Sequence, residues 1–340
     1  MPLGRYDAGP GAVATGGGAA VRHFALGPGS EFDHIRAIVG LLGDRVGQVG
    51  DDCAVVRRPD GFLVLSTDLS IERYHFQREW LSFEEIGWRA AASGLSDLAA
   101  EGAEPLGLLA SVAVPKDEAG ATERIMAGGG APAADAGTMV LGGDLSACPA
   151  IIVDVVAVGH TTRPITRAGA KPGDGLWVTG TLGGARAALD AWRDGREPVP
   201  VARERFARPV PRLAAGRWLA ARGARAMIDL SDGLVGDARH VAAASEVGLR
   251  IHLEQIPVDP SVVAEVVERG AQAQCYAAEG GEDYELLAAL PPEFGAAEAH
   301  ECQRECGAVL TRIGDVVTGG AVRCTLAGVP QKLDGFDHFG

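Results

Sequence analysis

The chain has 340 residues, and 31 Lys and Arg against 45 Asp and Glu give a net charge of −14. Such a charge repels polyphosphate backbones, so no nucleic-acid partner is expected, and a chain of this length predicts two domains of ~100–200 residues each. No apolar run approaches the ~18 residues that a membrane span needs, so no membrane partner is expected either. The six cysteines include no C-x-x-C pair, which is typical of reduced thiols in a cytoplasmic protein.

The first 30 residues are rich in Gly, Ala and Pro and lack the apolar segment of a secretory signal, so residues 1–30 are expected to form a disordered tail. Helical spacing of Ile35, Val39 and Leu42 then predicts a short helix that ends at Gly43. Two β-like runs, Cys53–Arg57 and Phe62–Thr67, follow and are joined by a hairpin turn that contains Pro and Gly.

The next segments alternate helices with strands. Ser82 and Glu85 form a capping-box pattern, which predicts an Ala-rich helix running to about Gly102. Residues 118–136 predict only a weak helix, broken by the glycines at 128–130 and by Pro132. Strands are predicted at Leu106–Val114, Met139–Leu141 and Ile151–Val158.

A boundary is predicted in residues 161–173, where Pro and Gly interrupt any periodicity, so that residues 31–162 form an N-terminal domain and residues 163–340 a C-terminal domain. The second half repeats the alternation. Its predicted strands are Leu176–Thr179, Ala226–Leu230, Leu249–Leu253, Tyr284–Leu290 and Val309–Ile313. Its predicted helices are Gly183–Trp192, Arg212–Arg222, Gly233–Ser245, Ser261–Arg269 and Glu293–Cys306. The pattern predicts an α+β fold with mixed sheets.

Six aspartates stand out, and three of them share one local shape, at the C-terminal end of an apolar run and at or just before Gly or Ser. The six are Asp52, Asp68, Asp97, Asp144, Asp229 and Asp232. Ligands bind at strand ends beside glycine turns in α/β architecture, and carboxylate oxygens are the ligands that Mg²⁺ prefers. A single aspartate is more often a turn former or a helix cap. It is their number that favours a site for hard cations.

Motifs of the common phosphate-binding and hydrolytic scaffolds are missing from the sequence. There is no G-x-x-x-x-G-K-[ST], no H-R-D with D-F-G, and no G-x-S-x-G. The glycine turn at residues 180–184 joins a predicted strand to a helix, and free amides there would suit an anion. This signal is weak by itself, because glycines also occur in ordinary strand-to-helix turns.

Eight short motifs occur in one order: G-D-D-C-A at 50–54, S-T-D at 66–68, L-S-D-L-A-A at 95–100, G-G-D at 142–144, T-R-A-G-A-K-P-G-D at 166–174, I-D-L-S-D-G-L at 228–234, G-G-E-D-Y-E-L at 280–286 and G-F-D-H-F at 335–339. Together they resemble the thiamine-monophosphate kinase family, within the superfamily that includes aminoimidazole ribonucleotide synthetase. The resemblance covers nearly all of the chain after residue 30, and several motifs in one order are far more specific than any one.

The resemblance implies a two-domain aminoimidazole ribonucleotide synthetase-like fold, α+β in class, that forms a homodimer through its N-terminal domains. It implies ATP-dependent phosphorylation of thiamine monophosphate to thiamine diphosphate, by in-line transfer assisted by several Mg²⁺ ions, in thiamine diphosphate biosynthesis. A phosphate monoester with a second pKa of ~6 is mostly dianionic at pH 7, so the attacking oxygen needs no general base.

The same resemblance implies roles for residues at the matching positions. Mg²⁺ would be held by Asp52, Ser66, Thr67, Asp68, Asp97, Asp144, Asp229 and Asp232. ATP would be contacted by Gly143, Asp144, Arg167 and Ser231, and thiamine monophosphate by His75, Glu282 and Phe336. Asp232 and Arg167 would take part in the chemical step.

The chain departs from the family pattern at three positions. Leu145 stands where the family usually has Thr, Gly94 where it has Asn, and Glu101 where it often has Met. These departures predict weaker ATP affinity or an altered nucleotide preference. Two alternatives stay open: another ATP-using member of the superfamily, similar to aminoimidazole ribonucleotide synthetase, or a catalytically silent regulator that binds ATP or metal. The retained aspartates argue against the silent regulator.

Overall fold

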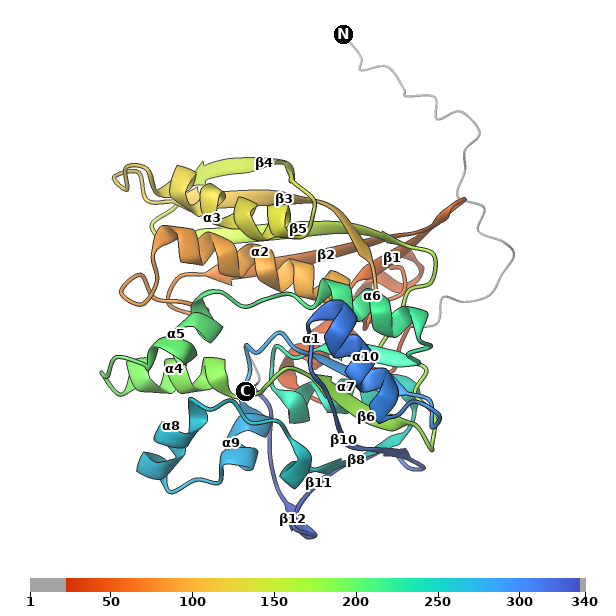
Figure 1. The fold of residues 1–340 in the computed structure, drawn as a ribbon. Coiled ribbons are helices and arrows are strands. Elements are labelled where there is room, and N and C mark those ends of the chain that lie inside the picture. Colours follow the sequence, from red (N-terminus) through yellow and green to blue (C-terminus); the bar gives the residue numbers. More distant parts are fainter. Residues whose placement is uncertain (1–22, 337–340) are drawn as a thin grey trace.

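The computed structural model of the chain describes residues 23–336, which contain two sheets with helices packed against them (Figure 1). This architecture confirms the predicted α+β class with mixed sheets. Of the predicted tail, residues 1–22 lie outside the described residues, as do positions 337–339 of the last motif. No helix within the described part of the chain is long and apolar enough to cross a bilayer.

The N-terminal sheet has the strand order β1-β2-β5-β3-β4, in which only β3 and β4 pair in parallel. Its strands are β1 (Ala54–Arg58), β2 (Gly61–Ile71), β3 (Glu104–Val114), β4 (Val140–Ala147) and β5 (Ile152–Thr161). Helices α2 (Phe83–Ala100) and α3 (Ala121–Asp135) cover one face, and no described helix covers the other (Figure 1). The predicted capping box is confirmed, since the Glu85 amide donates to Ser82 and the Ser82 amide donates to Glu85.

The C-terminal sheet has the order β12-β11-β8-β10-β6-β9-β7, and only β11 and β8 pair in parallel. Its strands are β6 (Gly175–Thr179), β7 (Ala226–Asp229), β8 (Gly248–His252), β9 (Leu286–Leu290), β10 (Leu310–Val317), β11 (Val322–Leu326) and β12 (Val329–Gln331). The helices around it are α4 (Gly184–Arg193), α5 (Pro200–Ala207), α6 (Leu213–Ala221), α7 (Leu234–Ser245), α8 (Val262–Arg269), α9 (Ala273–Glu279) and α10 (Ala296–Cys306), and α1 (Ser30–Leu42) precedes both sheets.

Helix α2 lies between the two halves. It packs against β2 and β5 on one side and against α6 and β7 on the other. One cluster of buried apolar side chains continues from Val64 and Leu95 in the N-terminal half to Trp177 and Met227 in the C-terminal half. Polar residues on α2 are therefore held rigidly at the junction of the halves.

Two predictions for the N-terminal half are wrong. Helix α3 is continuous, with Pro132 inside it, because Gly128 and Gly129 form the surface that meets α2 and do not break the helix. Strand β4 does not end at Leu141 but continues to Ala147, because it pairs with β3 along this whole length. As a result Asp144 lies inside a strand, and so does Asp68 in β2. Elements α5, α9, β11 and β12 had no predicted counterpart.

Candidate functional site

Three carboxylates converge where the two halves meet. Asp52 precedes β1, Asp97 lies on α2, and Asp229 is the last residue of β7. Each offers one oxygen, and these oxygens lie within 4.8 Å of one another. Hard oxygen ligands at this spacing fit a Mg²⁺ ion, which binds carboxylates in preference to softer groups. The structure thus brings together three of the eight predicted metal ligands.

Arg167 provides a positive charge beside this cluster. Its Nη2 donates to Asp52 Oδ1 at 2.6 Å and its Nε donates to the same oxygen at 3.2 Å. The backbone amide of Arg167 donates to Asp51 Oδ1 at 3.0 Å. One arginine therefore ties the G-D-D segment to the C-terminal half.

The carboxylates are crowded and poorly hydrated. Burial, together with the charge of Asp52, raises the pKa of Asp229 to about 8. Burial raises the pKa of Asp97 well above its usual value, and the charges of Asp229 and Asp52 add to the effect. Burial and the charge of Asp52 likewise raise the pKa of Asp51 to about 7. A bound divalent cation would lower these pKa values and favour the ionised carboxylates. The donor set therefore fits a metal site.

The S-T-D motif divides its side chains between the two faces of the sheet, because alternate residues of a strand point in opposite directions. Ser66 donates to Asp97 on α2, and Asp68 on the same face is hydrogen-bonded to Ser93 of α2. Thr67 points to the helix-free face and donates to Asp154 Oδ1 of β5 at 3.0 Å.

Asp144 also lies on the helix-free face. Ser111 of β3 pairs with Asp154 on one side and with Asp144 on the other, which places the three side chains in one row across the sheet. The predicted ligands Thr67 and Asp144 are therefore separated by the sheet from the cluster of Asp52, Asp97 and Asp229. Packing alone requires glycine at position 143, because a Cβ there would lie 1.8 Å from the Ala110 carbonyl oxygen.

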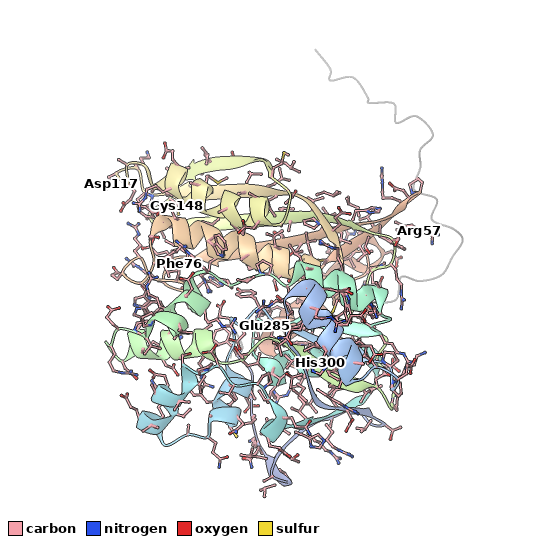
Figure 2. All side chains as sticks on the ribbon, in the orientation of Figure 1. Arg57, Phe76, Asp117, Cys148, Glu285 and His300 are labelled. Atoms are coloured by element: carbon pink, nitrogen blue, oxygen red, sulfur yellow. The ribbon has the colours of Figure 1, made fainter. Side chains whose placement is uncertain are left out.

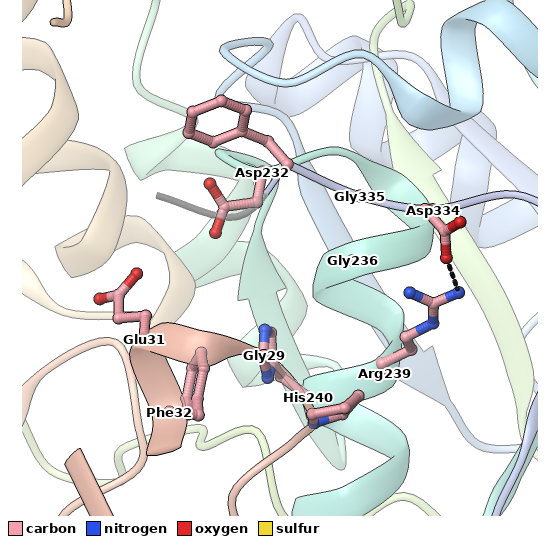
Figure 3. A pocket seen from close by; sticks show the side chains of 11 residues that line it. Gly29, Glu31, Phe32, Asp232, Gly236, Arg239, His240, Asp334 and Gly335 are labelled. Atoms are coloured by element: carbon pink, nitrogen blue, oxygen red, sulfur yellow. Dashed lines mark hydrogen bonds and ion pairs between the residues drawn. The ribbon is translucent and has the colours of Figure 1, made fainter. Parts of the chain in front are cut away.

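Ser231 and Asp232 follow β7 in a loop at the edge of a cavity of about 260 Å³. Asp232 lines this cavity with Phe32 of α1 and with Phe336 (Figure 3). The ring of Phe32 stacks on His240 with 4.1 Å between centroids. The loop is held by Asp237, whose Oδ2 accepts from the Asp232 amide at 3.3 Å, and the Phe336 amide donates to the Asp232 carbonyl at 3.0 Å.

The residues predicted to contact thiamine monophosphate come from three segments. His75 lies in the turn after β2, and its Nδ1 accepts from the Ile71 amide at 3.0 Å, which leaves the proton of the neutral ring on Nε2. Glu282 lies before β9 and accepts from Arg89 at 2.6 Å. Phe336 lies at the end of the described chain and is 56% exposed.

The glycine turn at residues 180–184 is not a free anion site. The Gly183 amide donates to Asp283 Oδ2 at 2.8 Å, so a carboxylate of the chain itself fills the turn. Nearby Glu285, at the centre of the molecule in Figure 2, is fully buried and accepts from Arg212 and Thr179. This part of the C-terminal half is a satisfied structural network.

Three residues of the site were not predicted. Asp154 is an acid inside the apolar strand β5, Arg89 is a cation inside the Ala-rich helix α2, and Asp237 is a buried acid on α7. The signal in each case is a charged residue within an apolar segment. Arg89 and Asp237 are buried as well, which is expensive unless the charge is paired. Sequence spacing alone does not reveal these partners.

Comparison with known proteins matches both halves to family models. Residues 50–161 match the N-terminal domain of AIR synthase related proteins, and residues 171–327 match their C-terminal domain. Thiamine-monophosphate kinase from Methanospirillum hungatei is 35% identical over 294 residues, which is 85% of this chain and 92% of that protein. Thiamine-monophosphate kinase from Escherichia coli O157:H7 is 33% identical over 319 residues, 91% of this chain and 95% of that protein.

A solved structure of AaThiL complexed with AMPPCP and TMP superposes on this chain with a TM-score of 0.82. The two chains are 32% identical, and the match covers 92% of this chain and 97% of the other. The similarity therefore extends through both sheets and the junction between them.

Proposed function

Because this chain belongs to the thiamine-monophosphate kinase family, we propose that it transfers the γ-phosphoryl group of ATP to thiamine monophosphate, giving thiamine diphosphate and ADP. The observation that carries this proposal is the cluster of Asp52, Asp97 and Asp229 at the junction of the halves. A solved relative that is complexed with AMPPCP and TMP supports the choice of the two substrates.

We infer that Mg²⁺ is held by Asp52, Asp97 and Asp229, with Ser66 and Asp68 on the same face of the sheet and Asp232 at the adjacent loop. Thr67 and Asp144 would hold Mg²⁺ on the other face of the sheet. There Asp154 would add a third oxygen ligand. Bound Mg²⁺ supplies positive charge that offsets the repulsion between two phosphorylated substrates.

The side chains of the chain itself orient the two substrates. Asp52 accepts from two nitrogens of the Arg167 guanidinium, and the third nitrogen, which has no hydrogen bond within residues 23–336, would contact an ATP phosphate. Ser231 and Gly143 would contact the nucleotide, and His75, Glu282 and Phe336 would hold thiamine monophosphate. Because the acceptor phosphate is already ionised at neutral pH, an in-line transfer needs alignment and charge neutralisation only, which agrees with the lack of a base–nucleophile pair.

A homodimer through the N-terminal sheets is also proposed. The helix-free face of that sheet exposes Val56, Leu69 and Leu109 by 45%, 47% and 38%. Exposed apolar side chains on an uncovered sheet face are typical of an interface. A second copy of the same sheet would cover them.

The test of the activity is a coupled assay of ADP release with ATP, Mg²⁺ and thiamine monophosphate, with thiamine as the control substrate. We expect turnover with the monophosphate only. Asp97→Asn should lower turnover at least ~100-fold, because a neutral amide is a poor ligand for Mg²⁺. Asp135→Asn, on an exposed position of α3, is the matched control and should keep wild-type turnover.

Mg²⁺ should also raise the melting temperature of the wild type and of Asp135→Asn, and do so less for Asp97→Asn, which gives a readout independent of activity. No turnover of thiamine monophosphate at saturating Mg²⁺ would contradict the kinase proposal. Wild-type turnover in Asp97→Asn would contradict the metal assignment.

A further inference from the structure

One oxygen of the Glu282 carboxylate is held by two donors. Arg89 Nη2 donates to Glu282 Oε2 at 2.6 Å, and the Tyr284 hydroxyl donates to the same oxygen at 2.8 Å. Among residues 23–336 no group donates a hydrogen bond to Oε1, and the side chain of Glu282 is 26% exposed. The carboxylate is thus fixed at one oxygen while the other is left to accept from a ligand.

The backbone around Glu282 is strained, and hydrogen bonds to the neighbouring segment hold it in place. Glu282 has φ of 69° and Tyr284 has φ of 50°, which is the left-handed region that costs non-glycine residues about 1–3 kcal/mol. The Glu282 amide donates to the Ser231 carbonyl at 2.8 Å, and the Tyr284 amide donates to the Leu230 carbonyl at 2.9 Å. The loop therefore holds an unfavourable conformation by bonding to the segment that carries Ser231 and Asp232, and such strain concentrates at functional sites.

Arg89 reaches Glu282 from the other half of the molecule. Its side chain is buried, its Nη1 donates to the Phe206 carbonyl at 2.7 Å, and its guanidinium lies 3.9 Å above the Phe206 ring. Because the guanidinium is planar and held on both edges, it has little freedom to follow a moving partner. It fixes the direction of the Glu282 carboxylate.

We propose that Arg89 and Tyr284 are positioning residues, which aim Glu282 Oε1 at the 4′-amino group of the substrate pyrimidine. The inference rests on the proposed function. An ionised carboxylate only accepts hydrogen bonds. At neutral pH the N–H donors of thiamine monophosphate are those of its 4′-amino group, because its phosphate and its thiazolium ring carry none. A carboxylate that faces this substrate can therefore accept an N–H hydrogen bond only from the 4′-amino group.

The test compares thiamine monophosphate with oxythiamine monophosphate, in which an oxygen replaces the 4′-amino group. Wild type should prefer the amino substrate in kcat/KM by ~100-fold, because the oxygen at the 4′ position of the analogue offers no donor to Glu282 Oε1. Tyr284→Phe removes one donor and should raise the KM for thiamine monophosphate ~3–10-fold, with kcat and the KM for ATP nearly unchanged, and shrink the preference. Arg89→Lys should retain more of the preference than Arg89→Met.

Arg203→Met is the matched control. Arg203 of α5 also pairs across the halves, with Glu85 of α2, but both oxygens of Glu85 accept hydrogen bonds within the protein. This variant should lose stability and keep the wild-type substrate preference. If it loses the preference as Arg89→Met does, the effect is structural and the inference is overturned.

An unchanged preference in folded Tyr284→Phe overturns the inference while leaving the proposed function intact, and it decides the matter even where Arg89→Met fails to fold. A wild-type chain that does not phosphorylate thiamine monophosphate overturns the proposed function, and the inference with it.

Discussion

Glu101 is a buried carboxylate at the end of α2. It follows α2, is fully buried, and neither of its side-chain oxygens has a hydrogen-bond partner among the described residues. Burial raises the pKa of Glu101 well above its usual value, and the charges of Asp51 and Asp52 add to the rise. This position is one of the three departures from the family pattern, in which Met is common. An apolar side chain of similar length would fit the same space without the desolvation cost.

Glu101→Met should therefore raise the free energy of unfolding at pH 7–8 by about 1–3 kcal/mol. The folded chain binds the Glu101 proton more tightly than the unfolded chain does, so the destabilisation is absent below the unfolded pKa and grows as pH rises above it. The gain should accordingly shrink as pH falls towards about 4, near the unfolded pKa of Glu. Urea denaturation of the metal-free wild type and of Glu101→Met at several pH values measures this gain in the free energy of unfolding.

Glu104→Met, at an exposed position of β3, is the control and should change stability by less than about 0.5 kcal/mol. A loss of stability in Glu101→Met at pH 8 would contradict the desolvation cost assigned to the Glu101 carboxylate.

At the scale of elements, α2 and α3 approach so closely that glycine is required between them. A Cβ at Gly128 would lie 1.9 Å from the carbonyl oxygen of Glu84, which belongs to the backbone of α2 and cannot move aside. Gly130, two residues further along α3, has nothing within 4 Å of such a Cβ. The two glycines thus differ in packing while sharing one helix.

Gly130→Ala should stabilise the protein by about 0.5–1 kcal/mol, because Ala has the higher helix propensity. Gly128→Ala should instead lower stability by at least ~1–3 kcal/mol, because the helices must separate to admit the methyl group. Thermal denaturation of the two variants, compared with the wild type, measures the sign of both stability changes. Equal stabilisation by both would contradict the close contact of α2 with α3.

The same contact explains why sequence patterns predicted α2 well and α3 poorly. The capping box at Ser82 is a local signal, and it begins α2 where expected. The glycines at 128–130 and Pro132 are local signals of a break, but packing on α2 overrides them. Strand β4 was predicted too short for a related reason, since its glycines pair with β3 through contacts that are distant in sequence.

On the scale of the whole molecule, the motifs identified residues but not their grouping. Asp52, Asp97 and Asp229 come from three elements far apart in sequence and meet because α2 packs against both sheets. Thr67 and Asp68 are neighbours in sequence yet face opposite sides of one sheet. Glu282 lies in a motif, but its contact with Arg89 was not predictable from any local pattern, because the two residues are 193 positions apart in the chain.

The helix-free face of the N-terminal sheet carries the last prediction. If two copies of the chain associate through it, Leu69→Glu and Leu109→Glu should convert a dimer into a monomer in sedimentation equilibrium, because each would bury a charge in an apolar interface. Val267→Glu, on α8 and 76% exposed, is the control and should leave the dimer intact. A second copy over this face would also cover Thr67, Asp144 and Asp154, so the Leu69 and Leu109 variants should lose kinase activity together with the dimer. A monomeric wild type that is fully active would contradict both expectations.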